Sequence, residues 1–240
     1  MATRLKAVLP LVVSIGVLAF VATWLSLNFT FHWVTVQNGV FGKYGLPEGI
    51  HLVLPAIFVT WGLFFALGAN NGAIKKTLVA AFTGSLGATI TIVVGPLLAD
   101  SPDFWGLAVM IGVTAAALVV LSTTVADDLF APAPAFGCYA AVFFWWIATG
   151  LDNFVPDGKG PRTVDAITAA ITNKPLSAGT GAFGGLLSMP WQWVSISVFA
   201  SLVLGTLFGV VSVRLAGALG HLGVHRARPT SSGPGVAAGA

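Results

Sequence analysis

The sequence predicts an all-α membrane protein, a polytopic bundle of six transmembrane helices. Only 8% of its 240 residues are charged and 56% are hydrophobic, whereas a soluble domain carries about 25% charged residues. The apolar residues fall in runs near the roughly 20 residues that a helix needs to cross a bilayer. The expected spans cover residues 7–27, 50–67, 77–98, 104–125, 135–151 and 190–218. We expect one membrane domain, residues 1–218, and a disordered cytoplasmic tail, residues 219–240.

The first apolar run has the basic start of a signal peptide, with Arg4 and Lys6 ahead of it. It is longer than the roughly 7–15 apolar residues of a signal-peptide core, and no small-residue cleavage site follows it. We therefore expect residues 7–27 to form the first membrane helix. Two longer segments, residues 28–49 and 152–188, are expected as insertions on the outer side, and residues 163–172 within the second favour a short helix.

The second and third runs are expected to form a hairpin around a short polar turn, residues 68–76. Asn70, Asn71 and Gly72 are ordinary turn residues. A sharper interpretation makes this turn an inner vestibule in which Lys75 and Lys76 attract anions.

The distribution of basic residues predicts the orientation in the membrane. With a cytoplasmic N-terminus, the inner side holds Arg4, Lys6, Lys75, Lys76, Arg214, Arg226 and Arg228. The outer side holds Lys43, Lys159, Arg162 and Lys174, most of them in one long loop. Because cytoplasmic loops of membrane proteins carry the excess of Lys and Arg, we expect an inner-membrane protein with both termini in the cytoplasm. The net charge of +3 is too small to indicate nucleic acid, so the expected partners are the lipid bilayer and a second copy or another membrane protein.

Small residues recur four apart in three of the expected helices, which lets helix backbones approach closely in lipid. The residues expected to pack helices in this way are Gly84, Ala88, Gly112, Gly205 and Gly209. When Pro55 is aligned with Pro134, Phe64 also meets Phe143 and Phe65 meets Phe144. The match is short, but it favours two halves of three helices each. An odd number of helices in each half gives the halves opposite orientations, an inverted repeat.

Three segments resemble a known family. PAIFVTWGLFFALGANNGAIKKTLVAAFTGSLGA, DDLFAPAPAFGCYAAVFF and VFASLVLGTLFGVVS are similar to helices of the YcdZ-like bacterial inner-membrane family, a domain of unknown function. The resemblance implies a multi-helix inner-membrane protein and supplies no catalytic residue or substrate. The two outer insertions depart from the compact family pattern.

Polar groups within the spans are mostly hydroxyls, which can bridge helices or line a path for a small solute. The candidates for a pore or vestibule are Thr60, Asn70, Asn71, Thr83, Thr89, Thr149 and Ser197. No Asp, Glu, Lys or His lies near the middle of a span, which disfavours ion-coupled transport and an intramembrane hydrolase. We expect no enzyme activity, cofactor or metal.

Two further patterns contain groups that can bind ligands, and neither predicts a site. The Gly179-x-Gly181-x-x-Gly184 pattern lacks the βαβ setting of a dinucleotide fingerprint. His32, His51 and Asp152 offer metal-binding groups, but single interfacial histidines are more common than metal sites. Two functional hypotheses remain: a passive channel or facilitator for a small, mostly uncharged solute, and a non-transporting accessory or scaffold subunit that docks a partner through its outer loops.

Overall fold

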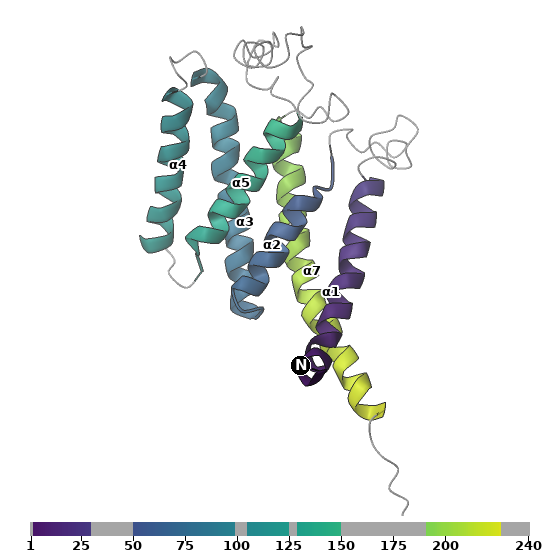
Figure 1. Ribbon diagram of the computed structural model, residues 1–240. Coiled ribbons are helices and arrows are strands. Elements are labelled where there is room, and N and C mark those ends of the chain that lie inside the picture. The colour runs from purple at the N-terminus through teal and green to yellow at the C-terminus, as the bar shows by residue number, and fades with distance from the viewer. Residues whose placement is uncertain (1, 30–49, 99–104, 125–128, 150–190, 227–240) are drawn as a thin grey trace, which may run out of the picture.

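The fold was analysed in a computed structural model, which describes residues 2–29, 50–98, 105–124, 129–149 and 191–226 (Figure 1). These residues form six α-helices: α1 (Ala2–Asn28), α2 (Leu54–Ala66), α3 (Asn71–Val94), α4 (Trp105–Thr124), α5 (Pro132–Thr149) and α7 (Trp191–Arg226). The short 3₁₀ helix η3 (Gly95–Leu98) directly follows α3. The predicted all-α class is therefore confirmed for the described part of the chain. The insertions, with the expected helix at 163–172, lie outside the described residues.

Successive helices alternate in direction (Figure 1). The start of α1, the turn between α2 and α3, the end of α4, the start of α5 and the end of α7 all lie at one end of the bundle, which we call the turn end. Lys75 and Lys76, in the first turns of α3, lie at this end. The alternation is the one that the sequence predicts.

Within the described part of the chain, four helices are long and apolar enough to cross a membrane, over Val8–Asn28, Asn71–Val94, Trp105–Thr124 and Gln192–His221. The apolar helices Leu54–Ala66 and Pro132–Ile147 are shorter. The expected second span therefore differs from the structure: residues 51–53 are not helical and α2 begins only at Leu54. At the other end of the chain, α7 continues to Arg226, past the expected end at residue 218.

The turn between α2 and α3 is tighter than residues 68–76. Gly68 and Ala69 adopt the left-handed conformation, with φ of 97° and 53°, which ends α2 as a left-handed C-terminal residue commonly does. Asn70 then caps α3, because its Oδ1 accepts a hydrogen bond of 2.9 Å from the Ala73 N–H. Asn side chains at this position satisfy an N–H group that the helix itself leaves unpaired.

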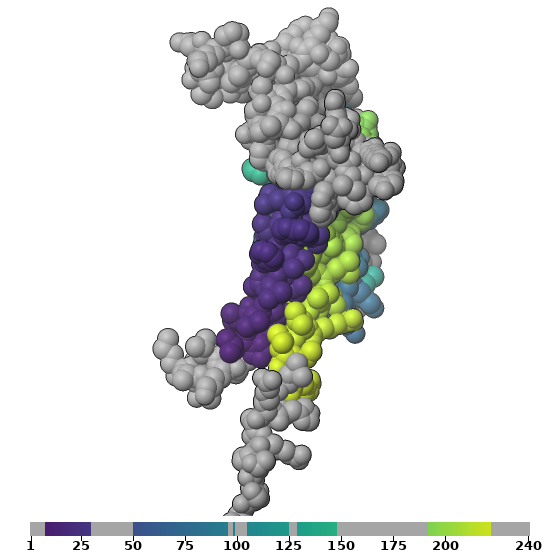
Figure 2. Space-filling view, turned by 90° about the vertical axis from the view of Figure 1, so that its right-hand side faces the viewer, coloured from purple at the N-terminus to yellow at the C-terminus, as the bar shows by residue number. Residues whose placement is uncertain are grey.

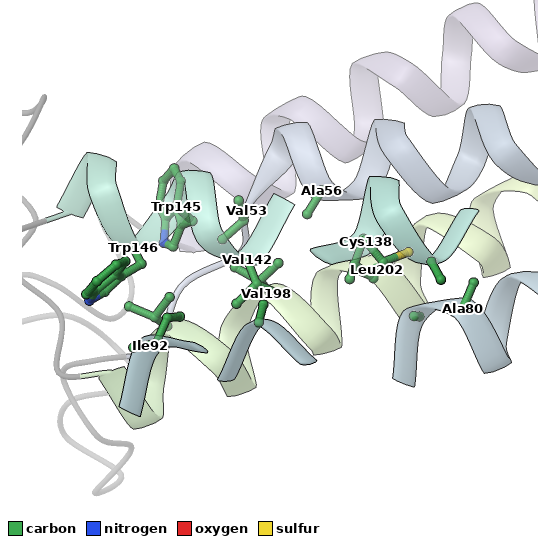
Figure 3. Packing of buried hydrophobic residues seen from close by; sticks show 14 of the residues in the cluster. Val53, Ala56, Ala80, Ile92, Cys138, Val142, Trp145, Trp146, Val198 and Leu202 are labelled. Atoms are coloured by element: carbon green, nitrogen blue, oxygen red, sulfur yellow. The ribbon is translucent and has the colours of Figure 1, made fainter. Parts of the chain in front are cut away.

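Four helices form the centre of the bundle. α2, α3, α5 and α7 supply almost all of the main buried cluster, which includes Val53, Ala80, Ile92, Cys138, Val142, Trp146, Val198 and Leu202 (Figure 3). A second cluster joins Ala22 of α1 to Ile57 and Trp61 of α2 and Phe208 of α7. The outer helices α1 and α4 therefore flank the centre on opposite sides (Figure 1).

The flanking helices present large apolar side chains to the surroundings. Figure 2 shows α1 and α7 lying side by side along the bundle. Phe20 on α1 is 71% exposed and Val113 on α4 is 59% exposed. Large exposed apolar surfaces on a monomer mark contact with another protein or with lipid, so these faces agree with a membrane setting.

Candidate functional site

The α2–α7 contact is made backbone to backbone. A Cβ added at Gly205 would overlap the carbonyl oxygen of Ile57 and the hydroxyl of Thr60. One turn along α7, a Cβ at Gly209 would come within 2.9 Å of Cγ of the Phe64 ring. Thr60 is fully buried and donates a hydrogen bond of 2.5 Å to the carbonyl of Leu202. The candidate pore residue Thr60 therefore lies inside a helix contact.

The α3–α5 contact has the same character. A Cβ at Gly84 would overlap the carbonyl oxygen of Ala135 and come within 2.8 Å of Cβ of Cys138 and the backbone nitrogen of Tyr139. Ala88, one turn along α3, is fully buried. Gly84 therefore lies against the backbone of α5, and Ala88 lies in the main buried cluster.

Gly112 differs from the other four expected packing residues. It lies on the exposed face of α4, and a Cβ there would meet no atom within 4 Å. Among the described residues, the small-residue face of α4 therefore makes no close contact, because α4 turns a different face, with buried Thr114 and Leu118, toward the bundle.

A polar junction joins the helices α1, α2 and α7. Trp61 of α2 donates from Nε1 to the hydroxyl of Ser212 on α7 over 2.9 Å. Ser14 of α1 donates to the carbonyl of the same residue over 2.8 Å. The Trp61 ring also stacks on Phe208, with 5.5 Å between centroids.

A second polar junction joins α3, α4 and α5. Tyr139 of α5 donates to the hydroxyl of Thr91 on α3 over 3.0 Å, and Thr114 of α4 lies 3.4 Å from that hydroxyl. The candidate residues from the sequence include neither Tyr139 nor the residues of the first junction. Hydrogen-bond partners in helices far apart in the sequence leave no local pattern that would have identified them.

At the end opposite the turn end, the extended segment before α2 lies along α7. The backbone N–H groups of His51 and Val53 donate to the hydroxyls of Ser197 and Ser201 over 3.0 Å and 2.9 Å. Two extended residues advance about 6.6 Å and four helical residues about 6 Å, so the two spacings match. Ser197, a candidate pore residue, thus satisfies backbone that is not helical.

Thr89 and Ser195 connect α3 to α7, with 2.8 Å between their hydroxyl oxygens. Thr89 is only partly buried. Thr83, also partly buried, donates to the carbonyl of Val79 in its own helix over 2.8 Å.

The remaining candidates lie at helix ends. Asn70 caps α3, and the exposed Asn71 is the first residue of that helix, so both lie at the turn end. Thr149 is placed only as the last residue of α5. Thr60 and Ser197 therefore lie at different levels of the α2–α7 contact and Thr89 lies at the α3–α7 contact, whereas Asn70, Asn71 and Thr149 lie at helix ends.

Within the described ranges, no group of three or more His, Cys, Asp and Glu residues could hold a metal ion. His32, Asp152 and the glycine pattern at 179–184 lie outside those ranges. Cys138 is a free, buried thiol in the centre of the bundle, and His51 is buried at the start of the α2 segment.

A family model described as "Protein of unknown function (DUF1097)" matches residues 12–217 of the chain, which is most of its length. No curated protein and no solved structure matches it. The match covers all six helices at least in part.

Proposed function

Because the chain belongs to the DUF1097 family of unknown function, we propose its role from its own geometry: a passive facilitator for small, mostly uncharged solutes, and not an enzyme. One observation carries the proposal. The helices form two three-helix bundles, α1–α2–α7 and α3–α4–α5, that meet along one seam, where α2 and α7 each contact both α3 and α5.

An inverted repeat would explain this arrangement. In such a repeat, α1, α2 and α3 correspond to α4, α5 and α7. The α2–α7 contact is then equivalent to the α5–α3 contact, and the α1–α7 contact is equivalent to the α4–α3 contact. The two halves then exchange their last helices. Inverted repeats of this kind are common among transporters, and their sites lie where the repeats meet.

Equivalent residues support the correspondence. Gly84 and Gly205 each meet a backbone carbonyl of the paired short helix. Seven residues after each glycine, Thr91 and Ser212 accept the hydrogen bond of an aromatic side chain on that same short helix. The third residue of each polar junction comes from a flanking helix, Ser14 from α1 and Thr114 from α4.

Six membrane crossings fit the lengths of the helices. α2 has 13 residues, about 20 Å at the usual helical rise. The four residues before it, 50–53, add about 13 Å if extended, and the sum is close to the roughly 30 Å of a hydrocarbon core. Because Lys75 and Lys76 lie at the turn end and cytoplasmic loops carry the excess of Lys and Arg, we propose a bacterial inner-membrane protein with that end and both termini in the cytoplasm. The proposal also includes a relationship of this chain to the YcdZ-like bacterial inner-membrane family.

The solute path in this proposal follows the seam between the bundles. The hydroxyls of Thr89 and Ser195 lie on the seam and are only partly buried. The central parts of the helices contain no Asp, Glu, Lys or His, so the seam suits an uncharged polar solute better than an ion.

Stopped-flow light scattering on proteoliposomes tests the facilitator. Urea, glycerol and erythritol are the probes, and protein-free vesicles and vesicles with heat-denatured protein are the controls. We expect uptake of at least one probe to exceed both controls. Rates equal to the controls for every small neutral solute tried would overturn the proposal.

A second candidate function has one observation in its favour. Hydroxyls such as those of Thr60 and Ser14 donate to carbonyls inside packed helix contacts, which is how a scaffold without a pore would use them. Such an accessory subunit should co-purify with a membrane partner in fixed ratio, and deletion of residues 157–185 should release the partner. A homo-oligomer in detergent without any other protein would count against it.

A further inference from the structure

His51 is one of several described residues, with Ser26 and Ser85, whose buried side chain has a polar atom without a hydrogen-bond partner. Only 2% of its surface is exposed, and its Nδ1 has no hydrogen-bond partner among the described residues. Burying a polar atom without a partner is unfavourable, so such atoms in native structures call for an explanation.

The backbone fixes where the imidazole lies. The N–H groups of His51 and Val53 both point to α7, at Ser197 and Ser201. Side chains two apart in an extended segment leave it on the same face. Val53 belongs to the main central cluster, beside Trp145 in Figure 3, so His51 continues that face toward the outer end of the bundle.

This position is the outer end of the seam. The central cluster contains residues of α2, α3, α5 and α7, which are the four helices that form the seam. Its outer part includes the adjacent Trp145 and Trp146 of α5 and Ile92 of α3 (Figure 3). A solute that moves along the seam from the outer side therefore reaches His51 before it reaches the closely packed central cluster.

We propose that His51 is the outer solute-binding residue of the seam, with its free ring nitrogen hydrogen-bonded to a small uncharged molecule of the amide class, such as urea. The inference rests on the proposed facilitator function. An amide both donates and accepts hydrogen bonds, so it satisfies the ring nitrogen in either imidazole tautomer. The apolar neighbours in the cluster penalise an ion but admit a small neutral molecule.

Urea transport by His51 variants gives the first test. His51→Leu removes the hydrogen bond, and we expect the urea rate at low concentration to fall at least about fivefold, as the loss of one buried hydrogen bond predicts. His51→Gln keeps a polar group and should retain more of the rate. His221→Leu, on an exposed residue near the other end of α7, is the matched control and should transport as the wild type does.

A direct measurement separates the inference from the proposed function. In ¹⁵N-histidine NMR of the wild-type protein in nanodiscs, urea should shift the His51 signal and leave that of His221 unchanged. A shift without flux of any small neutral solute tried would support the binding site and end the facilitator proposal. An unshifted His51 signal, or a His51→Leu protein that transports urea like the wild type, would overturn the inference. The NMR test measures the wild-type protein and uses variants only to assign the histidine signals. It therefore decides the inference even if His51→Leu misfolds.

Discussion

Gly205 of α7 lies directly against the backbone carbonyl of Ile57 in α2, with no room between them for a side chain. The glycine allows the backbones to touch and also brings Thr60 to the carbonyl of Leu202. In lipid, where the hydrophobic effect does not drive helices together, such close packing is a main source of association.

Gly205→Ala should therefore destabilise the protein. The added methyl group meets backbone, which cannot rotate away, and overpacking of this kind costs about 1–3 kcal/mol. Thermal unfolding in detergent measures the loss. Gly112→Ala is the matched control, because its Cβ would meet nothing within 4 Å and alanine has the higher helix propensity. Equal melting temperatures for the two variants would refute the described packing.

Thr60→Val should reduce stability, because it removes the hydrogen bond to Leu202 at nearly constant volume. Interhelical hydrogen bonds in membrane proteins contribute about 0.6 kcal/mol on average and up to about 1.7. Thr83→Val is the control, since its hydroxyl bonds within its own helix. Thermal unfolding in detergent measures the difference in stability between the two variants. A Thr60→Val protein with unchanged stability but altered solute flux would instead assign Thr60 to a pore.

The two polar junctions should contribute independently to stability. Tyr139→Phe removes the hydrogen bond to Thr91, and Ser212→Ala removes the acceptor of Trp61. We expect each to cost about 1 kcal/mol, and the double variant to show the sum, because the two sites share no partner. Chemical denaturation of the three variants measures this. A double variant much less stable than the sum would show that the bundles are coupled more tightly than two separate junctions allow.

A disulfide between α3 and α7 should form across the seam. With Cys138→Ala as background, Thr89→Cys with Ser195→Cys replaces hydroxyls 2.8 Å apart, a separation at which the side chains can be bridged with little backbone movement. Counting free thiols with a maleimide before and after reduction detects the bond. The pair Thr83→Cys with Ser195→Cys, nearly two turns away on α3, should stay reduced. If solute passes along the seam, oxidation should slow uptake and reduction should restore it.

Labelling from outside tests the orientation. In the Cys138→Ala background, Lys75→Cys places an exposed thiol in the first turns of α3. A membrane-impermeant maleimide added to intact spheroplasts should leave it unlabelled, and the same reagent should label it in inverted vesicles. Labelling in spheroplasts would place the turn end outside and reverse the proposed topology.

The sequence by itself determined the solvent and the direction of each helix. Long apolar runs with few charges allow only structures that satisfy their backbone internally in lipid, which is why the all-α class followed from composition and run length. The spacing of Gly84, Ala88, Gly205 and Gly209 also predicted close helix contacts, because a four-residue period places small residues on one face of a helix.

The tertiary structure alone decided which helices those faces meet. Gly112 has the same spacing but faces away from the bundle, since a small-residue face is closely packed only if a neighbour covers it. The partners of Trp61, Tyr139, Thr60 and Ser197 lie between 48 and 151 residues away along the chain. Contacts between distant segments arise from packing in three dimensions, and no local periodicity records them.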